Sequence, residues 1–181
     1  YDVTVSETEP VKEGYRFDGW TLNNDTETLY QAGDVVEMVE GGLTFKAQWT
    51  KLYNVCYYVD NTLVETKTFP EGTDVTNEVA YAYDLNDDSK TITDFVLATE
   101  NANLASINSD LVYRATTSVK TFTVTYYVDG VQYGEPTIVE YGSEVDVDVV
   151  SYTPDASRDF SGWTVTSGNV EKVTTDIVIS G

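Results

Sequence analysis

The stretch FTVTYYVDG, residues 122–130, is the segment that decides the expected fold of this chain. Apolar and polar side chains alternate along it, which is typical of an antiparallel strand with one buried face. The Asp-Gly pair at 129–130 follows this strand and precedes another strand-like run, so it predicts a tight β-hairpin. The apolar face would be made of Phe122, Val124, Tyr126 and Val128.

Related stretches recur along the chain. YNVCYYVD at 53–60 matches FTVTYYVD at 122–129, and LTFKA at 43–47 matches LVYRA at 111–115. FDGW at 17–20 has a counterpart in FSGW at 160–163, while ITDF at 92–95 puts Phe95 where the others have tryptophan. Recurrence of this kind marks a repeated structural unit. It predicts three divergent modules: residues 1–50, 51–118 and 119–181.

Each module is expected to run through an opening hairpin, a third strand, the F-x-G-W strand and a closing strand. In the last module the opening hairpin would span 122–140 and the third strand 144–150, where valines alternate with acids. The first module starts near the position of Tyr141, so we expect it to lack the opening hairpin. Since no stretch reads as a long amphipathic helix, the fold class is mainly β with little helix.

Charge is spread evenly over the chain. The net charge is −21, and each of the three modules carries −7 of it, so the acid is a property of every module's surface. Such a surface repels phosphate backbones and anionic lipid, which argues against nucleic-acid partners and direct membrane insertion. Apolar residues at 41% and aromatic residues at 13% are too abundant for a disordered acidic chain.

Composition also limits the chemistry. The chain has no histidine and a single cysteine, Cys56, which excludes a serine–histidine or cysteine–histidine site and an internal disulfide. Acidic residues are plentiful, but no spacing singles out the acid and nucleophile of a carboxylate-pair hydrolase. We therefore expect no enzymatic activity. The chain starts at Tyr1 without a leader, which suggests a piece excised from a longer protein.

One loop carries enough oxygen ligands to suggest calcium, although we expect no obligatory cofactor. It contains Asp84, Asn86, Asp87 and Asp88, but it lacks the glycine and the distal glutamate of an EF-hand. The acids at 144, 146 and 148 lie on a predicted strand, where alternate carboxylates stand about 6–7 Å apart and cannot share one ion.

The F-x-G-W motif has two interpretations. Trp20 and Trp163 could form a platform for sugar or peptide, or they could fill the core. Phe17 and Trp20 would face opposite sides of a plain strand, but a bulge at Gly19, and likewise at Gly162, would turn both rings to one side. A module of about 65 residues needs large apolar side chains to hold a core, so the core interpretation is favoured.

A family resemblance rests on residues 9–50, EPVKEGYRFDGWTLNNDTETLYQAGDVVEMVEGGLTFKAQWT. This stretch resembles the Listeria–Bacteroides repeat, the internalin B-repeat type of module. The opening strands are similar to mucin-binding-protein-type repeats. The resemblance implies tandem β-grasp-like modules, with mostly antiparallel sheets, in secreted and wall-anchored bacterial proteins, and it implies no catalytic residues. The matching residues are Pro10, Lys12, Gly14, Tyr15, Phe17, Gly19, Trp20, Leu43, Phe45, Ala47 and Trp49.

The expected function is a spacer, stalk and adhesion scaffold at the bacterial cell surface, in a segment that is monomeric and contacts its neighbouring repeats. One alternative is an adhesin module that binds a host surface protein or glycan. Another is a filament subunit in which a second chain donates the strand that the first module lacks. The residues expected to form the structural core are Tyr15, Phe17, Gly19, Trp20, Phe45, Trp49, Phe95, Phe160, Gly162 and Trp163.

Overall fold

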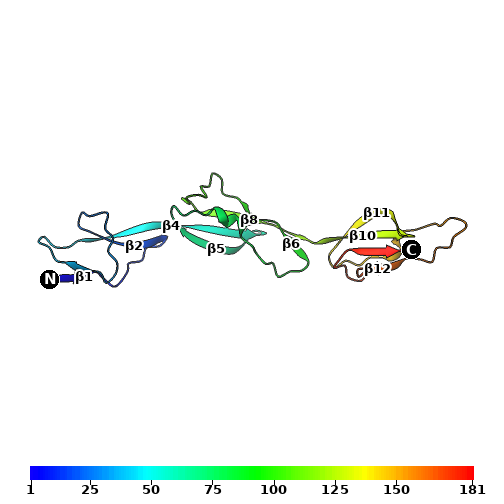
Figure 1. Cartoon of the computed structure of the whole chain (residues 1–181), viewed down its shortest axis with the longest axis horizontal. Helices are drawn as coiled ribbons and strands as arrows, with labels where there is room; N and C mark the ends of the chain where they lie inside the picture. Colours follow the sequence, from blue (N-terminus) through cyan, green and yellow to red (C-terminus); the bar gives the residue numbers. More distant parts are fainter. The chain divides into compact units, whose positions relative to one another are not determined.

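The structure, a computed structural model, describes all 181 residues (Figure 1). The contacts between Cα atoms divide the chain into two compact units: Tyr1–Ala82 with Asp94–Ala115, and Tyr83–Thr93 with Thr116–Gly181. Strands dominate and the only helices are two short 3₁₀ segments, so the predicted mainly-β class is confirmed. The first unit contains β1 (Asp2–Thr4), β2 (Tyr15–Leu22), β3 (Val35–Glu37), β4 (Phe45–Val59), β5 (Thr62–Pro70), η1 (Thr76–Ala80), β7 (Val96–Leu97) and β8 (Leu111–Ala115). The second contains β6 (Lys90–Ile92), β9 (Thr117–Val119), β10 (Thr121–Val128), β11 (Val131–Glu140), η2 (Val147–Val149), β12 (Thr164–Ser167) and β13 (Ile177–Ser180).

The second unit is built on a four-stranded sheet of order β11-β10-β13-β12. Its hairpin β10–β11 turns at Asp129 and Gly130, whose φ angles of 50° and 77° are the left-handed values that a two-residue hairpin needs. The closing strand β13 pairs in parallel with the opening strand β10 and antiparallel with β12. The hairpin predicted from Asp-Gly therefore forms where the sequence placed it.

The first unit repeats this order as β5-β4-β8-β7. Its hairpin β4–β5 turns at Asp60 and Asn61, again with positive φ angles of 47° and 69°. The closing strand β8 is parallel to the opening strand β4, with Val55 opposite Leu111. Two stretches recognised as copies in the sequence thus occupy equivalent strands.

Strand β4 belongs to three ladders. Its first part, through Lys51, pairs antiparallel with β2, and its second part pairs with β5 and β8 (Figure 1). The closing strand expected for module 1–50 therefore continues without a loop into the opening strand expected for module 51–118. A short ladder between β1 and β3 accompanies the β2 end of this unit.

Burial is uneven between these ladders. The sheet β5-β4-β8-β7 and the segments packed on it hold Val55, Tyr57, Val59, Val75, Phe95, Ile107, Leu111, Tyr113 and Ala115, each at most 6% exposed. The second unit buries Val124, Tyr126, Val173, Ile177 and Ile179. Around β2, Val5 is the only large apolar side chain that is buried.

Two expectations need correction. The strand expected at 144–150 is wrong, because the Asp146 carboxylate accepts a hydrogen bond from the Asp148 amide and turns this segment into η2. The F-x-G-W strand expected in the last module, with a bulge at Gly162, is also wrong, because residues 160–163 lie before β12 and outside any strand. Elsewhere, residues 82–91 end in β6, which pairs with β9 in the second unit. The stretch 21–42 contains β3, and its Tyr30 forms a backbone bridge to Trp20.

Candidate functional site

The F-x-G-W motif of the first module is shaped by a bulge in β2. The pairing of β2 with β4 shifts by one residue between Phe17 and Gly19, and the Gly19 φ angle is 135°. As a result Phe17 and Trp20 turn to the same side, with ring centroids 5.3 Å apart, and Phe17 also meets Trp49 at 5.4 Å. The bulge predicted at Gly19 is therefore present.

Strand register shows which residues take the tryptophan's place in the other modules. Thr21 lies opposite Lys46, Val96 opposite Arg114 and Thr164 opposite Ser180. The residue before each of these is Trp20, Phe95 and Trp163, so the three aromatic side chains occupy equivalent positions.

The three equivalent side chains differ in burial. Phe95 is buried at 5% exposure against Tyr57, 5.4 Å between centroids, whereas Trp20 and Trp163 are only half-buried. The Trp163 Nε1 donates a 2.6 Å hydrogen bond to the Val150 carbonyl, and the Trp20 Nε1 is buried without a partner. Neither indole N–H faces solvent, which weakens the idea of a tryptophan-centred glycan platform.

The remaining aromatic residues of the first module's motif lie around this group. Tyr15 is half-buried, and the Lys12 ammonium stands 3.8 Å from the centre of its ring. Phe45 is half-buried and meets Tyr30 edge-on, with centroids 6.2 Å apart. These contacts are those of a small apolar layer that is incompletely covered.

A charged side chain sits at the bulge itself. Asp18 accepts hydrogen bonds from the Arg16 Nε at 2.8 Å and the Thr50 hydroxyl at 2.5 Å. Burial raises the pKa of Asp18, but these hydrogen bonds and the charge of Arg16 outweigh it, so the pKa lies below its usual value. Asp18 thus holds the bulged loop against β4 as a carboxylate.

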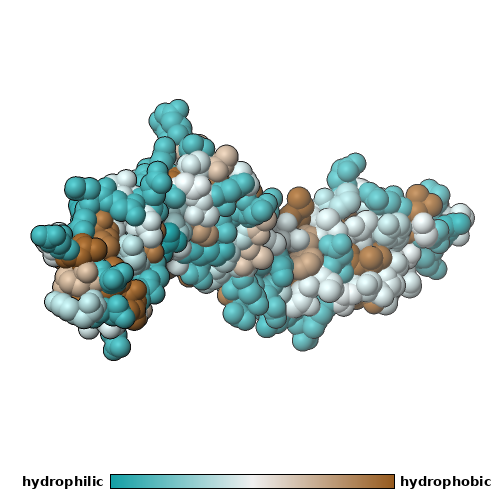
Figure 2. All heavy atoms as spheres, turned by 60° about the vertical axis from the view of Figure 1, so that its left-hand side comes forward, coloured by the Kyte–Doolittle hydropathy of each residue, from teal (hydrophilic) through white to brown (hydrophobic).

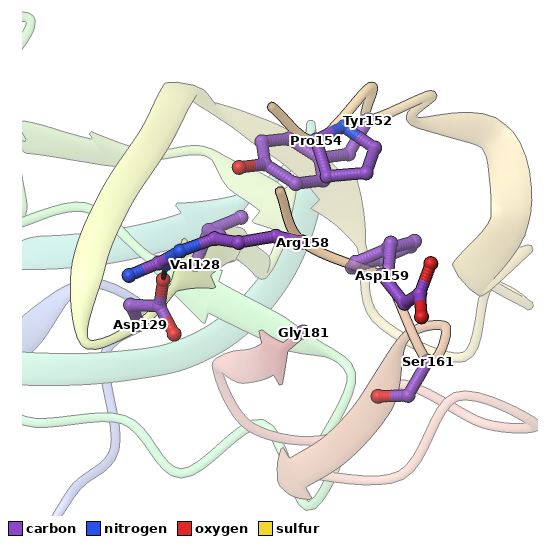
Figure 3. A pocket seen from close by; sticks show the side chains of 9 residues that line it. Val128, Asp129, Tyr152, Pro154, Arg158, Asp159, Ser161 and Gly181 are labelled. Atoms are coloured by element: carbon purple, nitrogen blue, oxygen red, sulfur yellow. Dashed lines mark hydrogen bonds and ion pairs between the residues drawn. The ribbon is translucent and has the colours of Figure 1, made fainter. Parts of the chain in front are cut away.

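The second unit has a cavity of about 270 Å³ beside its motif (Figure 3). Figure 3 shows Arg158 reaching across the cavity to Asp129, with which it forms an exposed ion pair. Trp163 is absent from the lining. The sequence predicts Phe160 only as a core residue, and it indicates no site at Tyr152, Arg158 or Asp129. The lining residues are Val128, Asp129, Tyr152, Pro154, Arg158, Asp159, Phe160, Ser161 and Gly181.

One partly buried group of polar side chains joins η1 to the sheet of the first unit. The Tyr57 hydroxyl donates to the Glu78 carboxylate at 2.7 Å, and the Lys67 ammonium donates to the same oxygen at 2.6 Å. Burial and the Glu78 charge raise the pKa of Tyr57. Burial also raises the pKa of Glu78, but its bonds with Lys67 and Tyr57 prevail and lower it. The group is therefore an ion pair at neutral pH.

The acidic loop considered for calcium is organised by its own backbone. Asp84 accepts from the Asn86 amide at 2.9 Å, and Asp87 accepts from the amide and hydroxyl of Ser89. Hydrogen bonds from Ser89 lower the pKa of Asp87, while Asp88 is exposed. Nowhere do three or more acidic or cysteine side chains converge as a metal site would require. Calcium binding stays a prediction.

Comparison with known proteins supports part of the sequence interpretation. No helix is long and apolar enough to cross a membrane. A search of curated proteins gave no match to the chain. The similarity of the opening strands to mucin-binding-type repeats stays a prediction. Residues 1–48 match the family model of the Listeria-Bacteroides repeat domain, a family that is typical of bacterial surface proteins.

Proposed function

We propose that the chain is a non-catalytic extracellular segment of a bacterial cell-surface protein, acting as a spacer or stalk and as an adhesion scaffold. The observation that carries this proposal is the parallel pairing of opening and closing strands, β4 with β8 and β10 with β13. The family match of residues 1–48 supports the cellular setting.

Parallel pairing fixes where the chain enters and leaves each sheet. Because β10 and β13 run in the same direction, the chain enters at one end of the sheet and leaves at the other. An antiparallel closing strand would return the chain to its starting end. An eight-residue strand such as β10 spans about 26 Å, so each complete module advances the chain by roughly that length.

The connection between the first two modules suits the same purpose. Strand β4 is 15 residues long and serves both ladders, so no flexible linker separates the β2 ladder from the β8 ladder. The even acidic charge, −21 in total, keeps such a segment soluble and discourages self-association. We propose no cofactor, and the partners are neighbouring repeats of the same chain.

Lengthening the chain tests the spacer function. Variants would carry one or two extra copies of residues 119–181 after Gly181, in a Cys56→Ser background, and small-angle X-ray scattering would measure their maximum dimension. We expect a constant increase of about 25–30 Å per copy, the length of an eight-residue strand. Copies with Tyr126→Asp, which cannot bury that ring, are the matched control and should give an irregular, flexible increase. A folded copy that adds less than about 10 Å would refute the proposal.

The cavity beside Arg158 favours a second candidate, binding of a host glycan or protein. It combines the aromatic rings of Tyr152 and Phe160 with an exposed ion pair between Arg158 and Asp129, groups that stack on and hydrogen-bond to sugars. A glycan array probed with the chain and with Tyr152→Ala tests it. Binding that Tyr152→Ala abolishes and that Tyr1→Ala, at an exposed ring outside the cavity, preserves would support this function. Absence of binding to every glycan and host surface would refute it.

A further inference from the structure

The closing strands of the two complete sheets each have two neighbours, but the equivalent strand of the first module has one. Strand β8 lies between β7 and β4, and β13 lies between β12 and β10. The equivalent segment of the first module is residues 43–47, because Lys46 pairs with Thr21 as Arg114 pairs with Val96. This segment pairs with β2 only, so the backbone groups along its other edge have no strand partner.

Backbone hydrogen bonds show where the absent neighbour belongs in the chain order. In the complete sheets, the Ile107 amide donates to the Thr73 carbonyl and the Val173 amide to the Ser143 carbonyl, both at 2.9 Å. In the first module the Met38 amide donates to the Tyr1 carbonyl, also at 2.9 Å. Tyr1 is therefore equivalent to Thr73 and Ser143. In both complete sheets the opening hairpin ends three residues before this point, at Pro70 in β5 and Glu140 in β11.

The open edge coincides with incomplete burial. Leu111 and Tyr113 are at most 1% exposed, and Ile177 and Ile179 are fully buried. Their equivalents Leu43 and Phe45 are only half-buried. Ala47 is also half-buried, whereas its equivalent Ala115 is 4% exposed. Figure 2 shows apolar atoms reaching the surface among hydrophilic ones on the part of the first unit that carries the N-terminus.

The aromatic position of the first module also lacks a partner that both complete sheets supply. Phe95 meets the opening-strand ring of Tyr57 at 5.4 Å, and Trp163 meets that of Tyr126 at 4.9 Å. Trp20 has Phe17 beside it but no opening-strand ring, and its buried Nε1 has no hydrogen-bond partner. An unpaired strand edge next to uncovered apolar side chains is what a β-strand partner recognises.

We propose that residues 43–47 are an acceptor edge for a β-hairpin contributed by a polypeptide segment outside residues 1–181. The first strand of this hairpin runs parallel to residues 43–47. Apolar residues at every second position, as in β10, cover Leu43, Phe45 and Ala47, and an aromatic residue packs on Trp20.

A second copy of this chain is the less suitable donor. Its two hairpins with the required pattern, β4–β5 and β10–β11, are already held in their own sheets by β8 and β13. Donating either of them would expose fully buried side chains such as Tyr57 or Val124 in order to cover half-buried ones. An outside hairpin carries no such cost.

A fusion tests the proposal in the full chain. The sequence of residues 121–142 is copied directly before Tyr1, which reproduces the order of the last module and gives a high effective concentration. Hydrogen exchange at residues 43–47 and the indole N–H resonance of Trp20 are measured. We expect alternate amides in this segment to exchange at least about tenfold more slowly than in the parent chain, and the indole resonance to shift. In the matched control the copied hairpin carries aspartate in place of Val124 and Tyr126, and both signals should stay at their parental values.

Three results would overturn the proposal. The first is equal protection in the fusion and its control. The second is full protection of residues 43–47 in the monomeric parent chain. The third is a parent chain that sediments as a dimer with this edge protected, which would assign the edge to a second copy.

Discussion

The β2 end of the first unit and the sheet of the second unit carry the same F-x-G-W motif, yet they differ in how well it is covered. In both, phenylalanine and tryptophan rings pack edge-on, with centroids 5.3 Å apart for Phe17–Trp20 and 4.9 Å for Phe160–Trp163. In the second unit, Tyr126 of the opening strand adds a third ring at 4.9 Å and buried valine and isoleucine side chains lie below it. At the β2 end no such strand is present.

The difference separates two effects, the pairing of the aromatic rings and the exclusion of water from them. The motif brings its phenylalanine and tryptophan rings together in both regions. At the β2 end a strand bulge at Gly19 does this, whereas Gly162 lies before β12 and outside any strand. Exclusion of water depends on the opening strand, because it adds buried side chains such as Val55, Tyr57 and Val124 to those of the closing strand. The following substitutions test this division of labour, from the largest expected effect to the smallest.

The largest difference in stability loss should come from truncating equivalent residues of a covered closing strand and of the open one to alanine. Tyr113 is fully buried and Phe45, at the same register position, is half-buried. We expect Tyr113→Ala to lower the free energy of unfolding by about 3–5 kcal/mol and Phe45→Ala by about 1–2 kcal/mol. Urea unfolding followed by circular dichroism and hydrogen exchange measures both. Tyr113→Phe is the control and should cost little, since the buried Tyr113 hydroxyl has no hydrogen-bond partner. Equal losses for the two alanine variants would contradict the comparison.

The second largest contrast should be the loss of stability when each motif glycine, Gly19 or Gly162, is replaced by alanine. A Cβ at Gly19 would lie 2.9 Å from the Tyr30 carbonyl and 2.7 Å from the Gln31 Nε2, whereas a Cβ at Gly162 meets nothing within 4 Å. Both have positive φ angles, 135° and 105°, which strain any side chain. Gly19→Ala should therefore cost about 2–4 kcal/mol and Gly162→Ala about 1 kcal/mol. Thermal unfolding monitored by tryptophan fluorescence distinguishes them, and a larger loss at Gly162 would show that the bulge is not the tighter site.

Much of the fold could be read from local patterns. The alternation in residues 122–128 and the Asp-Gly turn identified the opening hairpin, and the recurrence of LTFKA as LVYRA identified the closing strands. These features depend on the period of a strand and on turn residues that accept positive φ, as Asp129 and Gly130 do. Local sequence determines both.

The features that the sequence did not predict depend on contacts that strand periodicity and turn residues do not determine. Residues 144–150 alternate like a strand, but a side-chain bond from Asp146 to a backbone amide competes with pairing and produces η2. The cavity contains the contact between Arg158 and Asp129, which are 29 residues apart in the sequence. No local sequence pattern predicts that contact. The edge at residues 43–47 is open because no opening strand pairs with it, and the identity of the edge residues does not reveal this.

Removal of the indole N–H should have opposite consequences in the two motifs. Trp163 donates to the Val150 carbonyl, so Trp163→Phe should lose about 1 kcal/mol from that hydrogen bond in addition to the smaller ring. Trp20→Phe deletes a buried donor without a partner and should cost about 1–2 kcal/mol less than Trp163→Phe. Chemical denaturation of each variant gives the comparison. If an outside hairpin supplies a partner to Trp20, the advantage of Trp20→Phe should disappear in the hairpin fusion and persist in its aspartate control.

The smallest expected effect is a loss of folding stability at low pH, which should occur in the sheet of the first unit and not in that of the second. The Tyr57 hydroxyl bonds to a carboxylate, Glu78, whereas its counterpart Tyr126 bonds to the neutral carbonyl of Val147. The pKa of Glu78 is lowered in the folded chain, so its stabilisation is present above the unfolded pKa of about 4.3 and is lost as pH falls through the folded value. Since the Lys67 partner is 38% exposed, the contribution should be about 0.5–1 kcal/mol.

Glu78→Gln should remove this part of the pH dependence of stability below about pH 4.5 in the first unit and leave the second unit unchanged, as measured by hydrogen exchange. A wild-type first unit whose stability is flat between pH 3 and 6 would show that the ion pair contributes nothing to holding η1 on the sheet, and that packing of the Tyr57 ring alone closes this core.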